Sequence, residues 1–426
     1  MRILFLHQNF PGQFLQVAIA LQEQSGHELL ALVPAGHDNP HIIPVRTYPF
    51  DPRQVRTNVP LARHLTNRVA RGAAVASVLR ALQTEGFSPD LVIGHGGWGE
   101  TLFVRDIWPS CKILLYAEYF YSAVGSDVDF DPELFPLPVD DSLRMELRTR
   151  NTIMTLALLD ADHGIAPTAW QASLFPAALR DKIVVLHEGI NTDLICPARD
   201  AEVRLHRSDR RMRAGDEIIT FVSRDLEPYR GYHIFMRALP HILQCRPNAQ
   251  AVIVGGDKVS YGPPPPSGGS WKDIFFNEVR DRLDVARVHF VGRVPHEALL
   301  QLLRVSAAHV YLTYPFILSW SMLEAMSAGA LVIGSRTPPL EEVITHGRNG
   351  ILCGFFDING IADAVVDALT HPDRYQPVRE AGRRTVIERF DMRTVCLPAW
   401  LALLDQCYAT TQTMHRRPLV PVVRRD

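Results

Sequence analysis

The chain has 426 residues, of which 47% are apolar and 21% are charged, and its mean hydropathy is near zero. This composition is typical of a folded chain of two or three domains, and it excludes an intrinsically disordered protein. The formal net charge of −2 excludes the strongly basic balance of many nucleic-acid binders, and the sequence has no run of about 18 apolar residues that could span a bilayer.

The six cysteines are scattered, with no Cys-x-x-Cys pair and no histidine at metal-ligand spacing. This pattern favours neither a disulfide framework nor a zinc site, and it fits a reducing compartment. The apolar run at residues 1–6 is too short for a signal peptide. We therefore expect a cytoplasmic protein, and we leave open a peripheral attachment to the inner face of the membrane.

The first half of the chain alternates predicted strands and helices. Strands are expected at residues 2–7, 28–33, 91–94, 112–116, 163–166 and 182–186, and helices at 14–21, 65–82 and 143–159. Such an alternation predicts a parallel sheet that is covered by helices on both faces.

The pattern restarts after a polar connector at residues 188–200. Strands are expected at residues 217–223, 249–254, 287–291, 309–312, 331–334 and 350–352. We therefore predict an α/β protein of two doubly wound, Rossmann-like domains, residues 1–197 and 198–395, that face a central cleft. In such sheets, ligands bind outside the carboxyl ends of the strands.

Five arginines, Arg53, Arg56, Arg63, Arg68 and Arg71, interleave with apolar residues before and within the second predicted helix. Two interpretations stay open. The arginines could dock on anionic lipid or on an anionic acceptor, or they could form the solvated face of an amphipathic helix.

An acidic segment at residues 127–141 contains Asp127, Asp129 and Asp131 at alternate positions. Carboxylates at this spacing can coordinate Mg²⁺ or Mn²⁺. Because prolines flank the segment and no strand precedes it, we interpret it as a solvated loop.

The stretch 313–329 holds the first candidate binding site. A strand ends at Thr313, Pro315 breaks it, and a helix opens near Ser319 or Ser321, both of which suit an N-cap. The amides at such a helix start favour a phosphate. Glu324, one turn into the helix, could accept two hydrogen bonds from a ribose diol, or it could be an exposed helix residue.

The second candidate site follows the first strand of the second half. Arg224 lies at the strand end, and Arg230 follows six residues later beside Gly231. Two cations on one such loop can clamp a diphosphate and stabilise a departing group. The alternative is a pair of solvated loop arginines.

Taken in order, these segments resemble the retaining, family 4-type glycosyltransferases of the GT-B fold, the bacterial glycosyl transferases group 1. The family shows Gly-Arg, Lys-Gly, Gly-Gly, Phe-x-Gly and Glu-x7-Glu motifs in this order. The corresponding positions here are Ser223-Arg224, Arg230-Gly231, Gly255-Gly256, Phe290-Val291-Gly292 and the stretch that contains Glu324.

The resemblance implies a nucleotide diphosphate sugar, most simply a UDP-sugar, as the donor. Arg224 and Arg230 would hold its diphosphate, and Glu324 would bind its ribose. The backbone would supply the remaining donor contacts, through the amides of Ser319 and Trp320 at the distal phosphate, Arg293 and Val294 at the base, Gly255 in the Gly-Gly motif, and Gly12 at the donor phosphate and sugar.

Two positions depart from the family pattern. Phe316 stands where the family has the first glutamate of the Glu-x7-Glu motif, so the donor sugar must be held in another way. Glu118 aligns with a histidine that the family often has near the reacting carbon. His95 follows the preceding strand and could project toward the same place. We take Glu118 and His95 as candidate catalytic residues, together with Arg224 and Arg230.

The function expected from the resemblance is transfer of a hexose to an acceptor hydroxyl with retention of configuration. We expect no cofactor and no metal, because the arginines supply the positive charge. The acceptor is a glycan, a lipid-linked molecule or a small molecule, and not a nucleic acid. The alternatives are a nucleotide-sugar epimerase on the same fold and a catalytically degenerate partner subunit. As in the family, a helix at residues 396–413 should cross back to the first domain, and residues 414–426 should form a disordered tail.

Overall fold

The computed structural model describes residues 1–38, 41–135, 138–205 and 210–415. The chain folds into two compact units. Unit 1 comprises Met1–Ala123, Asp140–Glu188 and the chain from Arg393 onward, and unit 2 comprises Val124–Val139 and Gly189–Met392. The sequence predicts a boundary at residues 197/198, whereas in the structure the main passage into unit 2 occurs at Gly189.

Unit 1 is built on a parallel sheet of seven strands in the order β3-β2-β1-β4-β5-β6-β7. The strands are β1 (Arg2–Leu6), β2 (Glu28–Pro34), β3 (Val45–Tyr48), β4 (Leu91–His95), β5 (Lys112–Tyr116), β6 (His163–Ala166) and β7 (Ile183–Val185). All six strands predicted for this half are therefore confirmed. The missed strand, β3, lies at the edge of the sheet and buries only Tyr48, so it has no apolar run to reveal it.

Helices cover both faces of this sheet. The helices of the unit are α1 (Leu15–Glu23), α2 (Arg63–Thr84), α3 (Val104–Ile107), α4 (Asp141–Asp160), α5 (Ala169–Ser173), α6 (Ala177–Arg180) and α14 (Leu397–His415). Ile3 and Phe5 pack with α1 and α14, while Leu4 and Leu6 pack with α2 and α4. Because successive residues of a strand point to opposite faces, a strand buried on both sides is apolar throughout.

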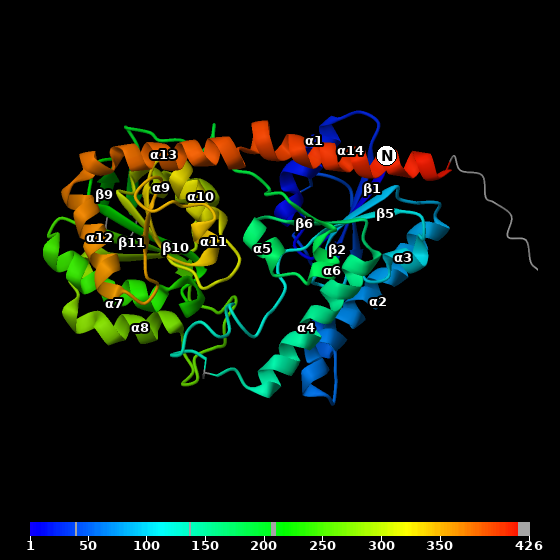
Figure 1. Cartoon of the computed structure of the whole chain (residues 1–426), viewed down its shortest axis with the longest axis horizontal. Coiled ribbons are helices and arrows are strands. Elements are labelled where there is room, and N and C mark those ends of the chain that lie inside the picture. The colour runs from blue at the N-terminus through cyan, green and yellow to red at the C-terminus, as the bar shows by residue number, and fades with distance from the viewer. Residues whose placement is uncertain (39–40, 136–137, 206–209, 416–426) are drawn as a thin grey trace, which may run out of the picture. The chain divides into compact units, whose positions relative to one another are not determined.

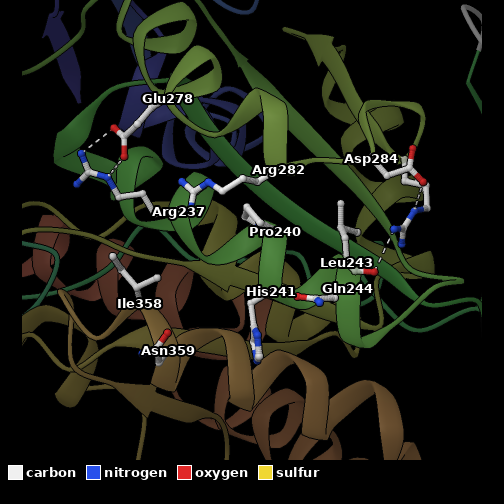
Figure 2. Close-up of a pocket in the computed structure, with 11 residues that line it drawn as sticks. Arg237, Pro240, His241, Leu243, Gln244, Glu278, Arg282, Asp284, Ile358 and Asn359 are labelled. Carbon is white, nitrogen blue, oxygen red and sulfur yellow. Dashed lines mark hydrogen bonds and ion pairs between the residues drawn. The ribbon is translucent and has the colours of Figure 1, made fainter.

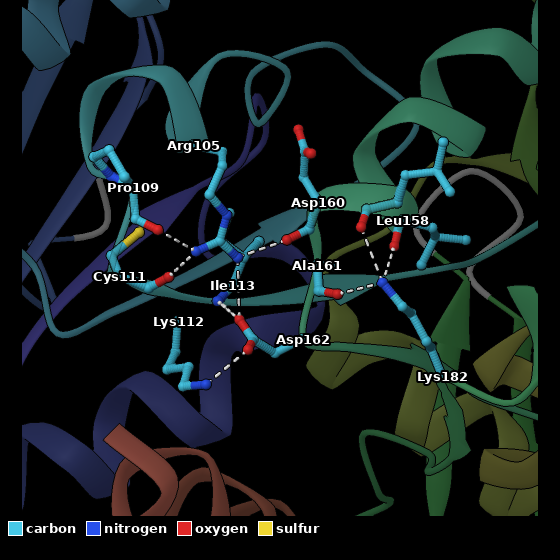
Figure 3. A network of polar contacts seen from close by, with 11 residues as sticks. Arg105, Pro109, Cys111, Lys112, Ile113, Leu158, Asp160, Ala161, Asp162 and Lys182 are labelled. Carbon is cyan, nitrogen blue, oxygen red and sulfur yellow. Dashed lines mark hydrogen bonds and ion pairs between the residues drawn. The ribbon is translucent and has the colours of Figure 1, made fainter. Parts of the chain in front are cut away.

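A polar network fixes the edge of the sheet where strands β5 and β6 begin (Figure 3). The carboxylate of Asp162 accepts hydrogen bonds from the backbone amide of Ile113 at 2.9 Å and from Lys112 Nζ at 2.8 Å, and Arg105 Nη2 lies 3.3 Å away. Lys182 Nζ donates to three carbonyl oxygens at the end of α4. These charges stabilise a helix end and a strand start, which is a structural task.

Unit 2 contains a parallel sheet of six strands in the order β12-β11-β10-β13-β14-β15, and a separate antiparallel pair, β8 and β9. The strands are β8 (Glu202–Leu205), β9 (Arg210–Arg213), β10 (Ile218–Asp225), β11 (Gln250–Gly256), β12 (Val288–Gly292), β13 (Ala308–Tyr311), β14 (Leu331–Ser335) and β15 (Ile351–Cys353). The six predicted strands are confirmed, and the β8–β9 pair was missed.

The helices of unit 2 also lie on both faces of their sheet. They are α7 (Tyr232–Cys245), α8 (Trp271–Val279), α9 (His296–Val305), α10 (Trp320–Ser327), α11 (Pro338–Glu341), α12 (Ile358–Thr370) and α13 (Pro372–Phe390). Figure 1 shows α7 and α8 on one side of β10 and β11, and α9 and α10 on the other. The predicted fold of two doubly wound α/β domains is therefore confirmed.

The strand order places one topological switch point in each sheet. In unit 1, β1 and β4 are neighbours; the next strand after β1 is added on one side of this pair and the next strand after β4 on the other. In unit 2 the same holds for β10 and β13. The loops that follow these strands diverge and leave a crevice, which is where doubly wound sheets bind their ligands. The two switch points therefore indicate where to examine the candidate residues.

The acidic segment that was expected to be a solvated loop is packed against unit 2. We call Val124–Val139 the strap. Asp127 and Asp131 are only 3% and 1% exposed, so the expectation of a solvated loop is wrong for both. Tyr229 Oη donates to Asp127 Oδ2 at 2.9 Å, and Tyr314 Oη donates to the carboxylate of Asp131. The partners lie a hundred or more positions away, so local sequence could not reveal them.

Helix α14 belongs to unit 1, although the preceding helix, α13, belongs to unit 2. Trp400 is 1% exposed, and its Nε1 donates to the carbonyl oxygen of His187 at 3.1 Å. The helix ends at His415, and residues 416–426 of the expected tail lie outside the described residues. In the described part of the chain, no helix combines the length and the apolar character needed to cross a membrane.

Candidate functional site

The predicted donor residues of unit 2 come from loops at the carboxyl edge of its sheet. Arg224 lies at the end of β10, and its side chain is exposed. Within the described part of the chain, its guanidinium makes no hydrogen bond or ion pair. Only its carbonyl oxygen is engaged, by Arg293 Nε at 3.2 Å. Arg224 is therefore available to an anionic ligand at the β10/β13 switch point.

Arg230 follows in a short 3₁₀ helix, Pro228–Arg230, and is only 5% exposed. Its Nη1 donates to Tyr311 Oη at 3.1 Å, to Thr313 Oγ1 at 2.8 Å and to the carbonyl oxygen of Ile317 at 2.8 Å. All three acceptors are neutral. Arg230 therefore holds the loop between β13 and α10 in place, and its charge interacts with the buried carboxylate of Glu227.

Phe316, at the position of the missing glutamate, belongs to an aromatic cluster around Arg230. It is 5% exposed, and its ring centroid lies 5.4 Å from that of Tyr229 and 5.1 Å from that of Tyr261. The Arg230 guanidinium lies 5.9 Å from the Phe316 centroid and 5.2 Å from the Tyr261 centroid, within the range of cation–π attraction. The phenyl ring thus packs on a buried cation and binds no sugar hydroxyl.

The start of α10 has the predicted N-cap. The amide of Ser321 donates to Ser319 Oγ at 3.4 Å, and Ser319 has extended backbone angles. The Ser319 amide donates to Tyr311 Oη at 2.8 Å, so a phosphate would have to replace this bond to reach it. The side chain of the next residue, Trp320, is 42% exposed.

Glu324 lies one turn into α10 and is 6% exposed. Its Oε1 lies 2.6 Å from Nε2 of His296, the first residue of α9, and this hydrogen bond raises the pKa of His296. His296 was not predicted from the sequence. The residue follows the loop expected at the nucleotide base by two positions, which is the only local signal that could have pointed to it.

The remaining donor residues also lie at this edge. A Cβ added to Gly255 would lie 2.9 Å from the carbonyl oxygen of Ser223, so no side chain fits there. Arg293 Nη2 donates to both carboxylate oxygens of Asp225, at 2.8 and 2.9 Å, and so ties the loop after β12 to the end of β10. Val294 is half-buried and packs against the core.

In unit 1, the two predicted catalytic side chains are in contact. His95 Nδ1 accepts a hydrogen bond from the amide of Gly97 at 3.1 Å, so the proton of the neutral ring resides on Nε2. This Nε2 donates to Glu118 Oε2 at 3.2 Å, and Gln13 Nε2 donates to Glu118 Oε1 at 3.3 Å. The Glu118 side chain is 22% exposed, so its carboxylate can still meet a ligand.

His7 belongs to the same cluster and was missed. It follows β1, is 4% exposed, and its ring centroid lies 5.8 Å from that of His95. Burial and the neighbouring His95 lower the pKa of His7 to about 3, so its ring is neutral at pH 7. Gly12 has a φ of +48°, and a Cβ there would lie 2.6 Å from His7 Cε1. A polar residue directly after the first strand was the available signal.

The structure therefore sorts the candidate residues into two groups. Arg224, Arg230, Gly255, Arg293, Val294, Ser319, Trp320 and Glu324 lie at the carboxyl edge of the unit 2 sheet or in the loops that follow it. Gly12, His95 and Glu118 lie at the corresponding edge of the unit 1 sheet. The first group offers cations, a helix start and a carboxylate, which suit a nucleotide diphosphate, and the second offers a hydrogen-bonded carboxylate.

A pocket of about 820 Å³ lies elsewhere on unit 2 (Figure 2). Its lining residues are Arg237, Pro240, His241, Leu243, Gln244, Glu278, Arg282, Asp284, Arg287, Ile358 and Asn359. Asp284 and Arg287 precede β12, so the pocket borders the amino edge of the sheet, away from the switch point. No candidate donor residue lines it.

One described group has the side chains and spacing that a cation site requires. Ligand atoms of Asp131, Glu133 and His233 lie within 4.8 Å of one another. However, Arg237 donates to both carboxylate oxygens of Glu133 at 2.7 Å. The guanidinium already neutralises the outer carboxylate, so a cation would compete with it.

Comparison with known proteins agrees with this arrangement. Residues 25–195 match the family model described as "Glycosyl transferase family 4 group", and residues 204–385 match the one described as "Glycosyl transferases group 1". The glycogen synthase of Mycobacterium tuberculosis is 28% identical over 211 residues, which are 50% of this chain and 48% of that protein. The GDP-mannose-dependent alpha-(1-6)-phosphatidylinositol monomannoside mannosyltransferase of Mycolicibacterium smegmatis is 25% identical over 251 residues, 55% of this chain and 60% of that protein. The matches thus span about half the length of these curated relatives.

Solved structures show the same fold. The structure of Anabaena HepE in complex with UDP has a TM-score of 0.66 and 19% identity, and covers 95% of this chain and 100% of that chain. The sucrose-phosphate synthase of Thermosynechococcus elongatus has a TM-score of 0.69 and 18% identity, and covers 96% of this chain and 100% of that chain. With family matches across both halves of its sequence, the chain belongs to the family 4-type, group 1 glycosyltransferases of the GT-B fold.

Proposed function

We propose that the protein transfers a hexose from a nucleotide diphosphate sugar, a UDP-sugar in the first instance, to an acceptor hydroxyl. The observation that carries this proposal is Arg224 at the unit 2 switch point, which is exposed and has no ion-pair partner among the described residues. It lies at the same sheet edge as the start of α10 and the carboxylate of Glu324. Two relatives support a nucleotide-sugar donor: HepE was solved in complex with UDP and with UDP-glucose, and the M. smegmatis enzyme is GDP-mannose-dependent.

In this proposal, Arg224 binds the diphosphate directly, and the amides at the start of α10 contact its distal phosphate. Arg230 contributes positive charge from a buried position, where the low local dielectric makes its field stronger than that of a solvated arginine. Glu324 accepts hydrogen bonds from the ribose hydroxyls. Stabilisation of the departing diphosphate by these groups supplies most of the rate.

The candidate groups of unit 1 act on the acceptor. Glu118 receives hydrogen bonds from His95 and Gln13, which fix its carboxylate and leave it partly exposed. We propose that this carboxylate orients the acceptor hydroxyl. The departing phosphate then takes the acceptor proton as the new glycosidic bond forms on the same face, so the anomeric configuration is retained.

We also propose that no metal is required and that the protein works in the cytoplasm. Cationic side chains stand where a metal would otherwise balance the diphosphate. The six cysteines are thiols and not disulfides in the structure, which fits a reducing compartment. A chelator should therefore leave transfer unchanged, and loss of transfer on chelation would contradict the metal-free reaction.

Thermal unfolding in the presence of UDP, GDP, ADP and their sugars is the first experiment, since a bound ligand raises the unfolding temperature. We expect stabilisation by UDP and UDP-sugars. Arg224→Ala should weaken nucleotide binding by about tenfold or more. Arg199→Ala, a change to an exposed arginine of the same unit, is the matched control and should have no effect.

The product identifies the reaction. NMR of the glycoside should show the donor's anomeric configuration, and an inverted product would contradict the retaining mechanism. Incubation of the nucleotide sugar without an acceptor separates transfer from epimerisation, because an epimerase forms a new sugar isomer under these conditions. Nucleotide binding without turnover across donors and acceptors would contradict an enzymatic role.

A further inference from the structure

Arg68 on α2 is a partly buried cation that pairs with no carboxylate in the described part of the chain. Its Nε donates to the carbonyl oxygen of Gly97 at 2.6 Å, and its Nη1 donates to that of His64 at 3.3 Å. Across the described residues, no carboxylate oxygen lies within 4.0 Å of its guanidinium nitrogens. Carbonyl oxygens satisfy N–H groups but carry no net charge. The positive charge of Arg68 is therefore uncompensated, which is a costly arrangement for a group withdrawn from water.

The surroundings of Arg68 add positive charge. Helices α2 and α4 lie side by side (Figure 1) and bring Arg71 and Arg150 near it. Arg71 pairs with the buried Glu100 at 3.1 Å, and Arg150 pairs with Glu146 at 2.7 Å. Each neighbouring arginine thus has a carboxylate partner, whereas Arg68 has none among the described residues. Burial, and then the charges of Arg150 and Arg71, lower the pKa of Arg68, opposed by Tyr121 and Glu100.

Histidine adds no further charge to this site. His64 lies on the same helix, with Nε2 3.4 Å from Glu146. Burial, together with Arg150 and Arg68, lowers the pKa of His64 to about 4, so its ring is neutral at pH 7. Among the described residues, the three arginines and their two glutamate partners therefore sum to one net positive charge.

Arg68 is held close to the candidate reacting groups of unit 1. Its guanidinium carbon lies 5.6 Å from the ring centroid of Trp98, and this ring lies 5.6 Å from the ring of His95, which donates to Glu118. A single indole thus separates the unpaired cation from the His95–Glu118 pair. A Cβ on Gly99 would clash with the carbonyl oxygen of Arg68, so helix and loop are in backbone contact and the spacing is fixed.

We propose that Arg68 binds an oxyanion of the acceptor, a phosphate ester or the phosphate of a lipid headgroup, while the acceptor hydroxyl lies at Glu118. A guanidinium with a free edge matches the oxygens of a phosphate, and the bound anion would complete the charge balance that the fold leaves open. This inference deepens the proposed function by naming the acceptor class. The proposal concerns Arg68 only. Arg53 and Arg63 belong to the same arginine-rich stretch, but their side chains are exposed.

The first experiment compares charged and neutral probes. Glucose 6-phosphate, glucose and inorganic phosphate are titrated into the full chain by calorimetry, with UDP present to occupy the nucleotide site. We expect glucose 6-phosphate and inorganic phosphate to bind, and glucose to bind about tenfold more weakly than glucose 6-phosphate or not at all. Arg68→Gln should remove this preference, whereas Arg80→Gln, an exposed arginine of the same helix, should keep it.

The second experiment separates the two sources of phosphate. Sedimentation with phosphatidylglycerol vesicles and with phosphatidylcholine vesicles shows whether a lipid headgroup occupies the site. Binding of phosphatidylglycerol that Arg68→Gln abolishes and glucose 6-phosphate competes away assigns a headgroup. Binding of glucose 6-phosphate without vesicle binding assigns a soluble acceptor. Either result supports the oxyanion site.

The proposal is overturned if the wild type shows no preference for the phosphorylated probes over their neutral counterparts, or if Arg68→Gln keeps that preference. Arg68→Lys is the control for a folding defect, because it retains the positive charge and should retain most of the preference for phosphate. UDP affinity, measured in the same variants, distinguishes this inference from the proposed function. If Arg68→Gln loses the preference for phosphate but binds UDP normally, the result concerns the oxyanion site alone. If the wild type does not bind UDP, the result contradicts the proposed donor site instead.

Discussion

Arg224 and Arg230 lie six residues apart, yet their environments differ completely. Arg224 is exposed, and its guanidinium makes no hydrogen bond or ion pair with any described residue. Arg230 is buried, and its Nη1 donates to one acceptor at the end of β13 and to two in the loop that follows. Arg224 is suited to meet a ligand directly. Arg230 positions the loop before α10, and its positive charge acts from a buried position without direct contact with the ligand. Both arginines were predicted to hold the diphosphate, because the sequence does not show that only Arg230 is buried.

The buried histidine His7 makes stability sensitive to acid. Its pKa is lowered to about 3, against about 6.5 in an unfolded chain, so between these values the unfolded state binds a proton that the folded state does not. The free energy of unfolding should therefore fall as pH drops below about 6.5, by up to about 1.4 kcal/mol per pH unit for this group. His7→Gln should flatten this dependence, measured by urea unfolding across that pH range.

Other buried histidines limit the effect. His309 also has a pKa lowered to about 3 by burial, so His7→Gln should flatten the profile only in part. An unchanged profile for His7→Gln would show that His7 is not neutral in the fold.

The pair of His296 and Glu324 should show the opposite pH dependence. The hydrogen bond to Glu324 raises the pKa of His296, so the pair contributes stability below the unfolded pKa of about 6.5 and loses it as pH rises through the folded value. Because the His296 side chain is 59% exposed, screening limits the contribution to at most about 1 kcal/mol. His296→Ala should lower the urea unfolding free energy more at about pH 6 than at about pH 9. Glu297→Ala on the same helix should show no such difference.

At the scale of elements, the strap is the least predictable part of the fold. Its sequence is acidic with flanking prolines, which favours solvent exposure, but Asp131 is buried against Tyr314 and His233. Burial raises the pKa of Asp131, but the contacts with His233 and Tyr314 lower it by more, so the net shift is downward and the carboxylate stays ionised. The strap therefore stabilises unit 2 through a buried, paired charge.

Asp131→Ala tests this role of the strap. The substitution leaves His233 and the Tyr314 hydroxyl buried without their partner, and the expected loss is about 3–5 kcal/mol of unfolding free energy. Urea unfolding with a probe in unit 2 measures it. Asp281→Ala, at an exposed aspartate of the same unit outside the strap, should change stability by no more than about 0.5 kcal/mol. Equal effects of the two substitutions would contradict a buried pair.

Regular elements were predictable wherever one physical pattern dominated. Strands such as β4 and β5 are buried on both faces, so they are apolar throughout and visible in sequence. Strand β9 reads Arg210–Arg213 and buries only Met212, so nothing in its composition distinguishes it from a loop. Edge and hairpin strands depend on their partners for stability, and sequence periodicity does not record those partners.

At the scale of the whole molecule, the order of the chain does not follow the order of the units. Helix α14 comes last in the sequence and packs on unit 1, where Trp400 is 1% exposed and lies 6.3 Å, centroid to centroid, from the ring of Phe14. The core of unit 1 is therefore complete only when the chain from Arg393 onward is in place.

Trp400→Ala should consequently destabilise unit 1. Truncation of a buried indole costs about 3–5 kcal/mol, and the bond to His187 is lost as well. Hydrogen exchange read by mass spectrometry should show faster exchange in β1 and β4, with little change in β10 and β13. Trp320→Ala serves as a control, because that side chain is 42% exposed in unit 2. Faster exchange confined to unit 2 would contradict the assignment of α14.

The sequence by itself determined the two doubly wound sheets and the loops that carry most of the candidate donor residues. Periodicity and a helix start with an N-cap are local patterns that locate Ser319, whereas the candidate roles of Arg224 and Glu324 follow from the family resemblance. Only the tertiary structure decided which charges are matched. That His296 contacts Glu324, and that Arg68 has no acidic partner among the described residues, depend on residues brought together from distant positions. Burial and pairing are properties of the packed molecule, and they set the chemistry of a charged side chain.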